Sequence, residues 1–484
     1  MSYLLLLLLP ALLSAQSLDE KLDALLARSP AIQRSAWGVH AVDLLTGRVL
    51  LARHENNFFV PASNTKLLST AMALNRLGPD YRLITRLAAD SPPDANGKLP
   101  ADLVLVGAGD TTLSARAIPY QKGPIAGDPM APLDSLADQA WQAGLRSVRG
   151  NIVGDDTAYL WEPYPDGWSK DDTLWEYGAP VSALILHDNA VELHAAPGLA
   201  PGDPARVWIT PSLGFFTFDS YVRTLARGSA SLLRFEPVDG ARQLRVWGAV
   251  PLQGGASQSI AVPDPARYAA FAMREALVRR GITVQGGSEA RHRFPGQPPP
   301  PAPPQYVLAQ RESPPLVELL KVVNKVSQNL HAEIALLETA RALGKPPGRA
   351  AALDQLKLFL AEAGIRPGDF YLKDGSGLSR LTLFTPAGFT TLLLHMMAGP
   401  NAEAWVGMMP VGGEDGTLSL RFKGLSQGRV MAKTGTISHV SALSGYLDTK
   451  DDRRIAFSII VNNANVPPSS IRQFIDRIVA MLAG

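Results

Sequence analysis

The sequence predicts a mixed α/β (α+β) protein of two or three domains, one of them rich in strands. The chain has 484 residues, which is too many for one ordinary hydrophobic core. Hydrophobic residues make up 46% of it, as is usual for a globular protein. Helical and strand-like patterns alternate along most of the chain, but strands dominate from about Gly178 to Pro263.

The N-terminus reads MSYLLLLLLPALLSAQS, and its apolar stretch from Leu4 to Leu13 is too short to span a bilayer. Small residues follow, so a signal peptidase could remove residues 1–15 by cutting after Ala15. A basic segment before the apolar stretch is missing, which leaves a buried strand or an uncleaved anchor as alternatives. We expect export to the periplasm or cell surface, as a soluble or loosely membrane-associated protein.

The first half of the chain predicts a helix, a hairpin, a second helix and then mixed elements. The helix begins at Leu18, and two alternating segments around Thr46 and Gly47 predict the hairpin. The next helix begins near Ser63. From about Tyr81, the strands in ADLVLVGAGD and GNIVGDDTAY alternate with the helix PLDSLADQAWQAGL. The strand-rich region includes LLRFEPV and RQLRVWGAV, and the helix YAAFAMREALVRRG and the strand ITVQGG follow it.

A proline-rich connector separates this region from a C-terminal part that predicts helices and then strands. Seven prolines lie between Pro295 and Pro304, which predicts an exposed extended segment. Helices are expected over 315–343, 349–363 and 386–397, followed by the strands RVMAKTG, SALSGYLD and RIAFSIIVN. A last amphipathic helix over 469–482 is expected to pack on these strands.

Composition excludes several classes of function. The net charge is +2, from 46 basic and 44 acidic residues, and gives no reason to expect a nucleic-acid partner. The chain has no cysteine, so disulfides, thiol nucleophiles and thiolate metal sites are excluded. The eight histidines are scattered without metal-ligand spacing, and we expect no metal and no cofactor.

Three short motifs carry the chemistry. Ser63 and Lys66 are three positions apart, so their side chains meet on one helical face, where a lysine of lowered pKa can activate a serine. Alone, this pair also fits an ordinary helix start. Ser327 and Asn329 form S-x-N, and Lys433 begins K-T-G on a predicted strand. In this order the three motifs resemble the motif set of serine–lysine acyl enzymes.

A competing pattern, G-x-S-x-G, surrounds Ser426. A nucleophile elbow needs a strand before its serine and a helix after it, but here a strand follows. We therefore interpret Ser426 as a turn residue.

The motifs, and the 264 positions between Ser63 and Ser327, resemble the low-molecular-mass class C penicillin-binding proteins. These are D-alanyl-D-alanine carboxypeptidase/endopeptidases of the peptidase S13 type. The stretches GAGDTTLS, YGAPVSALILHDNAVEL, SPPLVELLKVVNKVSQNLHAE, KDGSGLSR and MPVGGEDGTL are similar to that family as well, so the likeness covers nearly the whole mature chain.

The resemblance implies a penicillin-binding, serine β-lactamase-like catalytic domain, an antiparallel sheet flanked by helices, with two nested insertions. The catalytic domain would comprise residues 16–86 and 291–484. A second domain would comprise 87–177 and 263–290, and a third, β-rich domain 178–262 within the second. The compositional changes near Tyr81, Gly178, Pro263 and Pro295 agree with these boundaries.

The resemblance also implies a mechanism and a substrate. Ser63 would attack the carbonyl of a D-alanyl peptide bond of a peptidoglycan stem peptide, and Lys66 would accept its proton. Ser327, helped by Lys433, would pass a proton to the leaving amine, and Asn329 would hold the acyl side chain. β-Lactams would acylate the same serine.

Further residues are implied in substrate binding. Lys433 and Thr434, with Thr436, would receive the terminal carboxylate, and the backbone N–H groups of Ser63 and Thr436 would form the oxyanion hole around Gly435. The resemblance also implies that three further residues contact the free amino end of the stem peptide: Asp155, Tyr159 and Arg380.

Two departures and two alternatives qualify the resemblance. The middle motif is S-Q-N rather than S-D-N, and His439 lies beside the K-T-G motif without belonging to it, so it is a candidate substrate contact. A β-lactamase or esterase on the same fold is one alternative, although the chain has no E-x-x-L-N stretch to supply its water-activating base. A catalytically silent wall-binding scaffold is the other, and the intact motifs argue against it.

Overall fold

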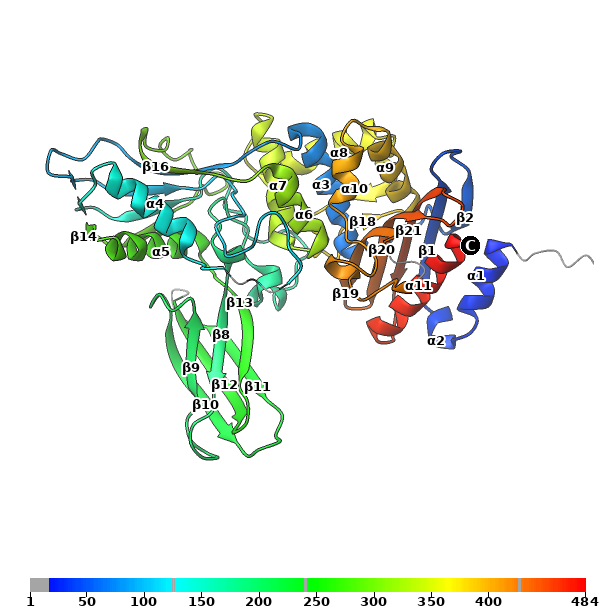
Figure 1. Ribbon diagram of the computed structural model, residues 1–484, viewed down its shortest axis with the longest axis horizontal. Coiled ribbons are helices and arrows are strands. Elements are labelled where there is room, and N and C mark those ends of the chain that lie inside the picture. Colours follow the sequence, from blue (N-terminus) through cyan, green and yellow to red (C-terminus); the bar gives the residue numbers. More distant parts are fainter. Residues whose placement is uncertain (1–16, 124, 126, 239–241, 425–427) are drawn as a thin grey trace, which may run out of the picture.

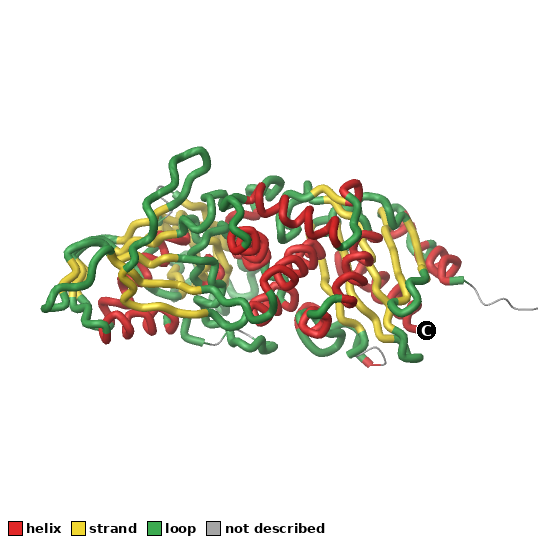
Figure 2. The backbone as a smooth tube through the Cα atoms, turned by 90° about the horizontal axis from the view of Figure 1, so that it is seen from above, coloured by secondary structure: helices red, strands yellow, loops and turns green. Residues whose placement is uncertain are grey.

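The computed structural model describes residues 17–123, 125, 127–238, 242–424 and 428–484. The molecule is elongated, with a lobe at each end, a layer of helices between them and a β-rich unit that projects to one side (Figure 1). Seen at right angles, the two lobes and the helical layer lie in a row (Figure 2). The predicted signal segment, residues 1–15, lies outside the described residues.

The first lobe is built on a five-stranded antiparallel sheet in the order β19-β20-β21-β1-β2. N-terminal and C-terminal strands are neighbours in it, since Ala36 of β1 pairs with Asn462 of β21. The strands are β1 (Ala36–Asp43), β2 (Val49–Arg53), β19 (Val430–Ile437), β20 (Val440–Asp448) and β21 (Arg454–Asn462).

Both faces of this sheet are covered, which explains why nearly every residue of β20 and β21 is buried. The terminal helices α1 (Leu18–Leu26) and α11 (Pro468–Ala483) cover one face. The short α2 (Pro30–Gln33) follows α1. Helix α9 (Pro386–Ala398) packs on the other face and leads into the helical layer.

The helical layer surrounds α3 (Lys66–Leu77), whose residues from Lys66 to Leu74 are all buried. It is preceded directly by the 3-10 turn η1 (Ala62–Thr65), which packs against β19. The other helices of the layer are α6 (Leu316–Lys325), α7 (Asn329–Ala342), α8 (Arg349–Glu362) and α10 (Ala402–Gly407). The two-stranded sheet of β17 (Phe370–Tyr371) and β18 (Leu383–Phe384) adjoins them.

The second lobe has a mixed five-stranded sheet in the order β15-β7-β5-β3-β16. Helices α4 (Ala131–Gln142) and α5 (Pro265–Arg279) pack on it. Its strands are β3 (Ile84–Ala89), β5 (Leu103–Val106), β7 (Ile152–Asp155), β15 (Ser288–Arg291) and β16 (Tyr306–Glu312). A small parallel sheet joins β4 (Lys98–Leu99), β6 (Ser147–Val148) and β14 (Thr283–Val284).

The projecting unit, residues 190–261, consists of two three-stranded sheets (Figure 1). We call it the outer β-unit. Val191, Leu193, Phe235 and Val246 are among the residues buried in it. Its strands are β8 (Ala190–Ala196), β9 (Arg206–Thr210), β10 (Thr217–Leu225), β11 (Leu232–Pro237), β12 (Gln243–Pro251) and β13 (Ala256–Ala261).

The structure differs from the sequence expectations in two places. The helical pattern predicted over 315–343 is broken between α6 and α7, where Ser327 has φ 67°. Strand β16 lies beyond the implied boundary at residue 291, yet it pairs with β3 at the edge of the second sheet, because that pairing satisfies its backbone groups. Residues 292–305, all of them described, form no helix or strand and are mostly exposed, as the proline run predicts.

Among the described residues, we find no helix with both the length and the apolar character needed to cross a membrane.

Candidate active site

The three motifs meet in one cleft, between the edge strand β19 and the helical layer. The cleft has a volume of about 340 Å³, and its lining includes Ser63, Ser327, Asn329 and Thr436 of the predicted set, together with Asp172 and Tyr177. Larger hollows exist elsewhere, including one of about 1020 Å³ beside α8, but their linings contain no residue of the three motifs.

The Ser63–Lys66 pair has hydrogen-bonding geometry. Ser63 lies in the 3-10 turn η1, partly exposed to the cleft, and Lys66 begins α3 and is completely buried. Nζ of Lys66 donates to Ser63 Oγ at 2.8 Å, to Asn329 Oδ1 at 2.6 Å and to the carbonyl oxygen of Ser376 at 2.7 Å. Three acceptors therefore hold the amine beside the serine hydroxyl.

The charge state of Lys66 depends on opposing effects. Complete burial lowers the pKa of Lys66 to about 7, while the carboxylates of Asp374 and Glu333 act in the opposite direction. A lysine with such a pKa exists largely as the neutral amine just above neutral pH, and a neutral amine can accept a proton from a hydroxyl.

The middle motif occupies the break between α6 and α7. Ser327 lies in the left-handed region, at φ 67°, which is rare for a residue with a side chain. Nζ of Lys433 donates to Ser327 Oγ at 2.8 Å. Burial lowers the pKa of Lys433 well below its usual value, and the charge of Lys66 lowers it further. Asn329 Nδ2 donates to the carbonyl oxygen of Tyr177 at 2.7 Å, which fixes its amide.

The edge strand β19 packs closely against η1. A Cβ on Gly435 would lie 2.8 Å from the carbonyl oxygen of Pro61 and 3.1 Å from the amide nitrogen of Ser63, so this approach requires glycine. The side-chain amide of Asn64 ties the two elements together, because it donates to the carbonyl oxygen of Lys433 at 2.9 Å and accepts from Ser444 Oγ at 2.6 Å.

The alternation of β19 directs the amide of Thr436 toward the cleft side of this edge. The amide of Ala432 bonds outward, to the carbonyl oxygen of Pro410 at 3.0 Å, and not to β20. Amides two residues apart in a strand point to the same side, so the amide of Thr436 also points outward. It therefore lies on the same side of β19 as η1, which carries Ser63.

The other predicted residues of the K-T-G edge have different surroundings. The Thr434 hydroxyl donates to Thr417 Oγ1 at 2.8 Å. Arg380 lines the cleft and donates from Nη1 to the carbonyl oxygen of Ser438 at 3.1 Å. His439 is exposed in the turn after β19; its Nδ1 lies 2.9 Å from the carbonyl oxygen of Ala464, and it lines a separate hollow.

Like His439, two further predicted residues, Asp155 and Tyr159, are not brought to the cleft. Asp155 is 1% exposed and accepts from the amide and hydroxyl of Thr157, with Arg291 as its ion-pair partner. Tyr159 is 2% exposed and donates to Glu338 Oε2 at 2.9 Å. Both side chains use their polar atoms inside the protein, because the strand end and loop that carry them are covered.

The cleft also contains residues that the sequence analysis missed. Asp172 and Tyr177 belong to the 3-10 turns η2 (Asp172–Leu174) and η3 (Glu176–Gly178), and the Tyr177 hydroxyl donates to Asp172 Oδ1 at 3.1 Å. The available signal was the acidic and aromatic run KDDTLWEY directly before GAPVSAL. Ser426 of the competing pattern lies outside the described residues.

In the part of the chain that the structure describes, no group of three or more acidic or histidine side chains is arranged to hold a metal ion.

Comparisons with known proteins agree on one family. The family model of the D-Ala-D-Ala carboxypeptidase 3 (S13) family matches residues 18–483. The D-alanyl-D-alanine carboxypeptidase of Actinomadura sp. (strain R39) is 34% identical over 484 residues, covering 96% of this chain and 85% of that protein.

Solved structures show the same fold. The crystal structure of penicillin binding protein 4 from Haemophilus influenzae superposes with a TM-score of 0.82 at 23% identity, covering 96% of this chain and 99% of that chain. The same protein complexed with a novel β-lactam gives a TM-score of 0.77 at 22% identity and the same coverage. The penicillin-binding fold with inserted domains, which the family resemblance implied, is thereby confirmed.

Proposed function

The chain belongs to the D-Ala-D-Ala carboxypeptidase 3 (S13) family, and on this premise we propose that it is a serine-type D-alanyl-D-alanine carboxypeptidase and DD-endopeptidase. Its substrates are the stem peptides of peptidoglycan, and β-lactams are its covalent inhibitors. One observation carries the proposal: the completely buried Lys66 donates to the hydroxyl of Ser63, which faces the cleft. Burying an amine costs folding free energy, and a protein that only binds the cell wall gains nothing that offsets this cost.

Acylation begins with the neutral amine of Lys66. It accepts the hydroxyl proton of Ser63 as Oγ forms a bond with the carbonyl carbon of the D-alanyl peptide bond. The negative charge that develops on the carbonyl oxygen is stabilised by the backbone N–H groups of Ser63 and Thr436, which lie on the two facing elements η1 and β19.

Breakdown of the tetrahedral intermediate uses the second serine. Ser327 passes a proton to the leaving amine, and the proton that Lys66 took from Ser63 restores the Ser327 hydroxyl, so Lys66 is neutral again. Lys433 is hydrogen-bonded to Ser327 Oγ and holds it in place for this transfer. The C–N bond then breaks and D-alanine leaves. Asn329 holds the acyl side chain, while Lys433, Thr434 and Thr436 bind the terminal carboxylate. Water hydrolyses the ester, with its proton returning through Lys66.

A β-lactam follows the same first step, but its amine stays attached to the acyl group and hinders the attack of water. The acyl-enzyme is therefore long-lived. Deacylation in seconds or less would instead favour the β-lactamase alternative.

The remote end of the stem peptide meets the far side of the cleft. The carboxylate of Asp172, beside the hydroxyl of Tyr177, suits a free amino group, and Arg380 suits a carboxylate. Because these substrates lie in the cell wall, we also propose that the protein is exported, in line with the predicted leader of residues 1–15.

The activity is tested on purified muropeptides, cross-linked and uncross-linked. Release of D-alanine from uncross-linked peptides is carboxypeptidase activity, and conversion of dimers to monomers is endopeptidase activity. We expect Ser63→Ala to lower both rates by about 10⁴-fold or more.

Ser438→Ala is the matched control, because Ser438 lines the same cleft without contacting Lys66. We expect this variant to remain active. A wild-type protein that binds muropeptides without cleaving them would favour the scaffold alternative and refute the proposal.

A further inference from the structure

Two buried carboxylates lie behind Lys66, and neither lines the cleft. Glu333 and Asp374 are both 0% exposed. The mechanism above makes no use of them, and burying a carboxylate is costly unless it is fully hydrogen-bonded or paired. Both carboxylates are hydrogen-bonded or paired, and one of their partners, Ser376, contacts the amine of Lys66.

Glu333 supports the backbone that receives Lys66. It lies one turn after Asn329 on α7, and its Oε1 accepts from the amides of Gly375 and Ser376, each at 2.9 Å. The carbonyl oxygen of Ser376 in turn accepts from Lys66 Nζ at 2.7 Å. Helix α7 therefore positions the amine twice, directly through Asn329 and indirectly through Glu333.

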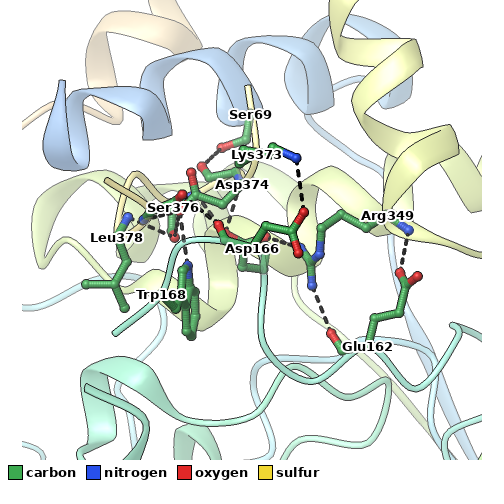
Figure 3. A network of polar contacts seen from close by, with 12 residues as sticks. Ser69, Glu162, Asp166, Trp168, Arg349, Lys373, Asp374, Ser376 and Leu378 are labelled. Carbon is green, nitrogen blue, oxygen red and sulfur yellow. Dashed lines mark hydrogen bonds and ion pairs between the residues drawn. The ribbon is translucent and has the colours of Figure 1, made fainter. Parts of the chain in front are cut away.

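Asp374 also holds the backbone around Ser376, because it accepts hydrogen bonds from its own loop and from Trp168 (Figure 3). Its Oδ2 accepts from the amide of Ser379 at 2.8 Å, from Ser376 Oγ at 3.0 Å and from Trp168 Nε1 at 3.2 Å. Its Oδ1 accepts from the hydroxyl of Thr382 at 2.7 Å. These bonds hold the loop from residue 374 to 382 in one conformation.

The segment of residues 160–168, which precedes the outer β-unit in the chain, supports both carboxylates. Arg349 pairs with Glu333 and also donates from Nη2 to the carbonyl oxygen of Glu162 at 3.0 Å. Trp168 of the same segment donates to Asp374. Figure 3 shows Glu162, Trp168, Arg349 and Asp374 as parts of one connected network.

The charges in this region are balanced in a way that suits proton transfer. The titratable groups nearest Lys66 are Glu333 on α7, Asp374 in its loop and Lys433 on β19. Arg349 offsets the charge of Glu333. One negative charge, that of Asp374, then remains to face the ammonium that forms when Lys66 takes the proton of Ser63.

We propose that Glu333 and Asp374 are positioning residues for Lys66, and that the segment 160–168 holds them in place. They fix the carbonyl that orients the amine, and their negative charge stabilises the ammonium formed during acylation. This inference rests on the proposed function of Ser63 and Lys66.

The test is the acylation rate of the full-length protein by a fluorescent penicillin between pH 5 and 9. Acylation needs neutral Lys66, so the wild-type rate rises through about pH 7. Asp374→Asn keeps the size and can keep the hydrogen bonds, but it removes a charge that favours the ammonium. We expect its midpoint to move to lower pH by about one unit, and its plateau rate to fall about tenfold.

Glu333→Gln is expected to shift the midpoint in the same direction. Glu338→Gln is the matched control: Glu338 is also on α7 and 2% exposed, but it bonds Tyr81, Tyr159 and Arg341 instead. Its pH profile should match the wild type. Trp168→Phe removes one bond to Asp374 and leaves its charge, so it should lower the plateau without moving the midpoint.

The outcomes separate the two claims. If the wild type is not acylated, the proposed function fails. If the wild type is acylated and the Asp374→Asn profile superposes on it, the positioning role is wrong. Should Asp374→Asn fail to fold, an unchanged plateau rate in Trp168→Phe would overturn the inference by itself.

Discussion

At the scale of single residues, the site depends on two lysines that are completely buried, Lys66 and Lys433. Each faces a serine hydroxyl, and burial lowers the pKa of both. An amine in such surroundings costs folding free energy whenever it would be protonated in water. The two residues therefore exchange stability for reactivity, as active sites commonly do.

This exchange predicts a pH dependence of stability. The pKa of Lys66 is about 7 in the folded protein and near its ordinary value of about 10.5 in the unfolded chain, so the unfolded chain binds more protons between these values. Stability therefore rises as pH increases from 7 toward 10. The contribution of Lys66 is on the order of a few kcal/mol over this window.

Urea unfolding at pH 7, 8 and 9 measures the effect. Lys66→Met lacks the titrating amine, so its free energy of unfolding should rise less steeply with pH than that of the wild type. Equal slopes for the two proteins would mean that Lys66 is not buried with a lowered pKa.

At the scale of elements, the site is made where regular structure ends. Ser63 is in a 3-10 turn before α3, Ser327 is in the break between α6 and α7, and Thr436 is near the end of β19. Sequence patterns identified all three motifs, because each needs particular residue types at fixed spacing. They did not identify the break at Ser327, since no glycine or proline marks it within the apolar pattern from Leu316 to Ala342.

The reason for that failure is tertiary. The positive φ of Ser327 is accompanied by the bond from Lys433, which is 106 positions away, and by the bond from Asn329 to Tyr177. Local propensity contains no information about either partner. The same limit applies to Asp172 and Tyr177, which enter the cleft only because the inserted segment folds back over α7.

At the scale of the whole molecule, distant segments form each lobe. The mixed α/β class and the strand-rich region were predictable from residue patterns, and the nesting was implied by the family resemblance. The pairing of β16 with β3 joins strands more than 200 positions apart and was not predicted. We propose that the outer β-unit is a separable insertion. Its two ends are neighbours, because Glu192 of β8 pairs with Ser259 of β13.

This proposal predicts that residues 193–258 can be replaced by a short glycine-containing turn. The replacement removes the edge contacts of Phe215 with Tyr268 and Phe271 of α5, whose ring centroids lie 5.2 and 5.4 Å from that of Phe215. It also removes the edge contact between Phe235 and Trp175, at 5.4 Å. We expect the shortened protein to fold and to be acylated by a fluorescent penicillin within about threefold of the wild-type rate. An insoluble or unreactive product would show that the unit is an integral part of the fold.

The central claim is that Ser63, activated by Lys66, forms the acyl-enzyme, and the position of a penicillin adduct tests it most directly. Intact mass after incubation with penicillin should increase by one penicillin per chain. Digestion and peptide mapping should locate the adduct on Ser63, and the Ser63→Ala protein should gain no mass. An adduct on another residue, or a modified Ser63→Ala protein, would contradict the account.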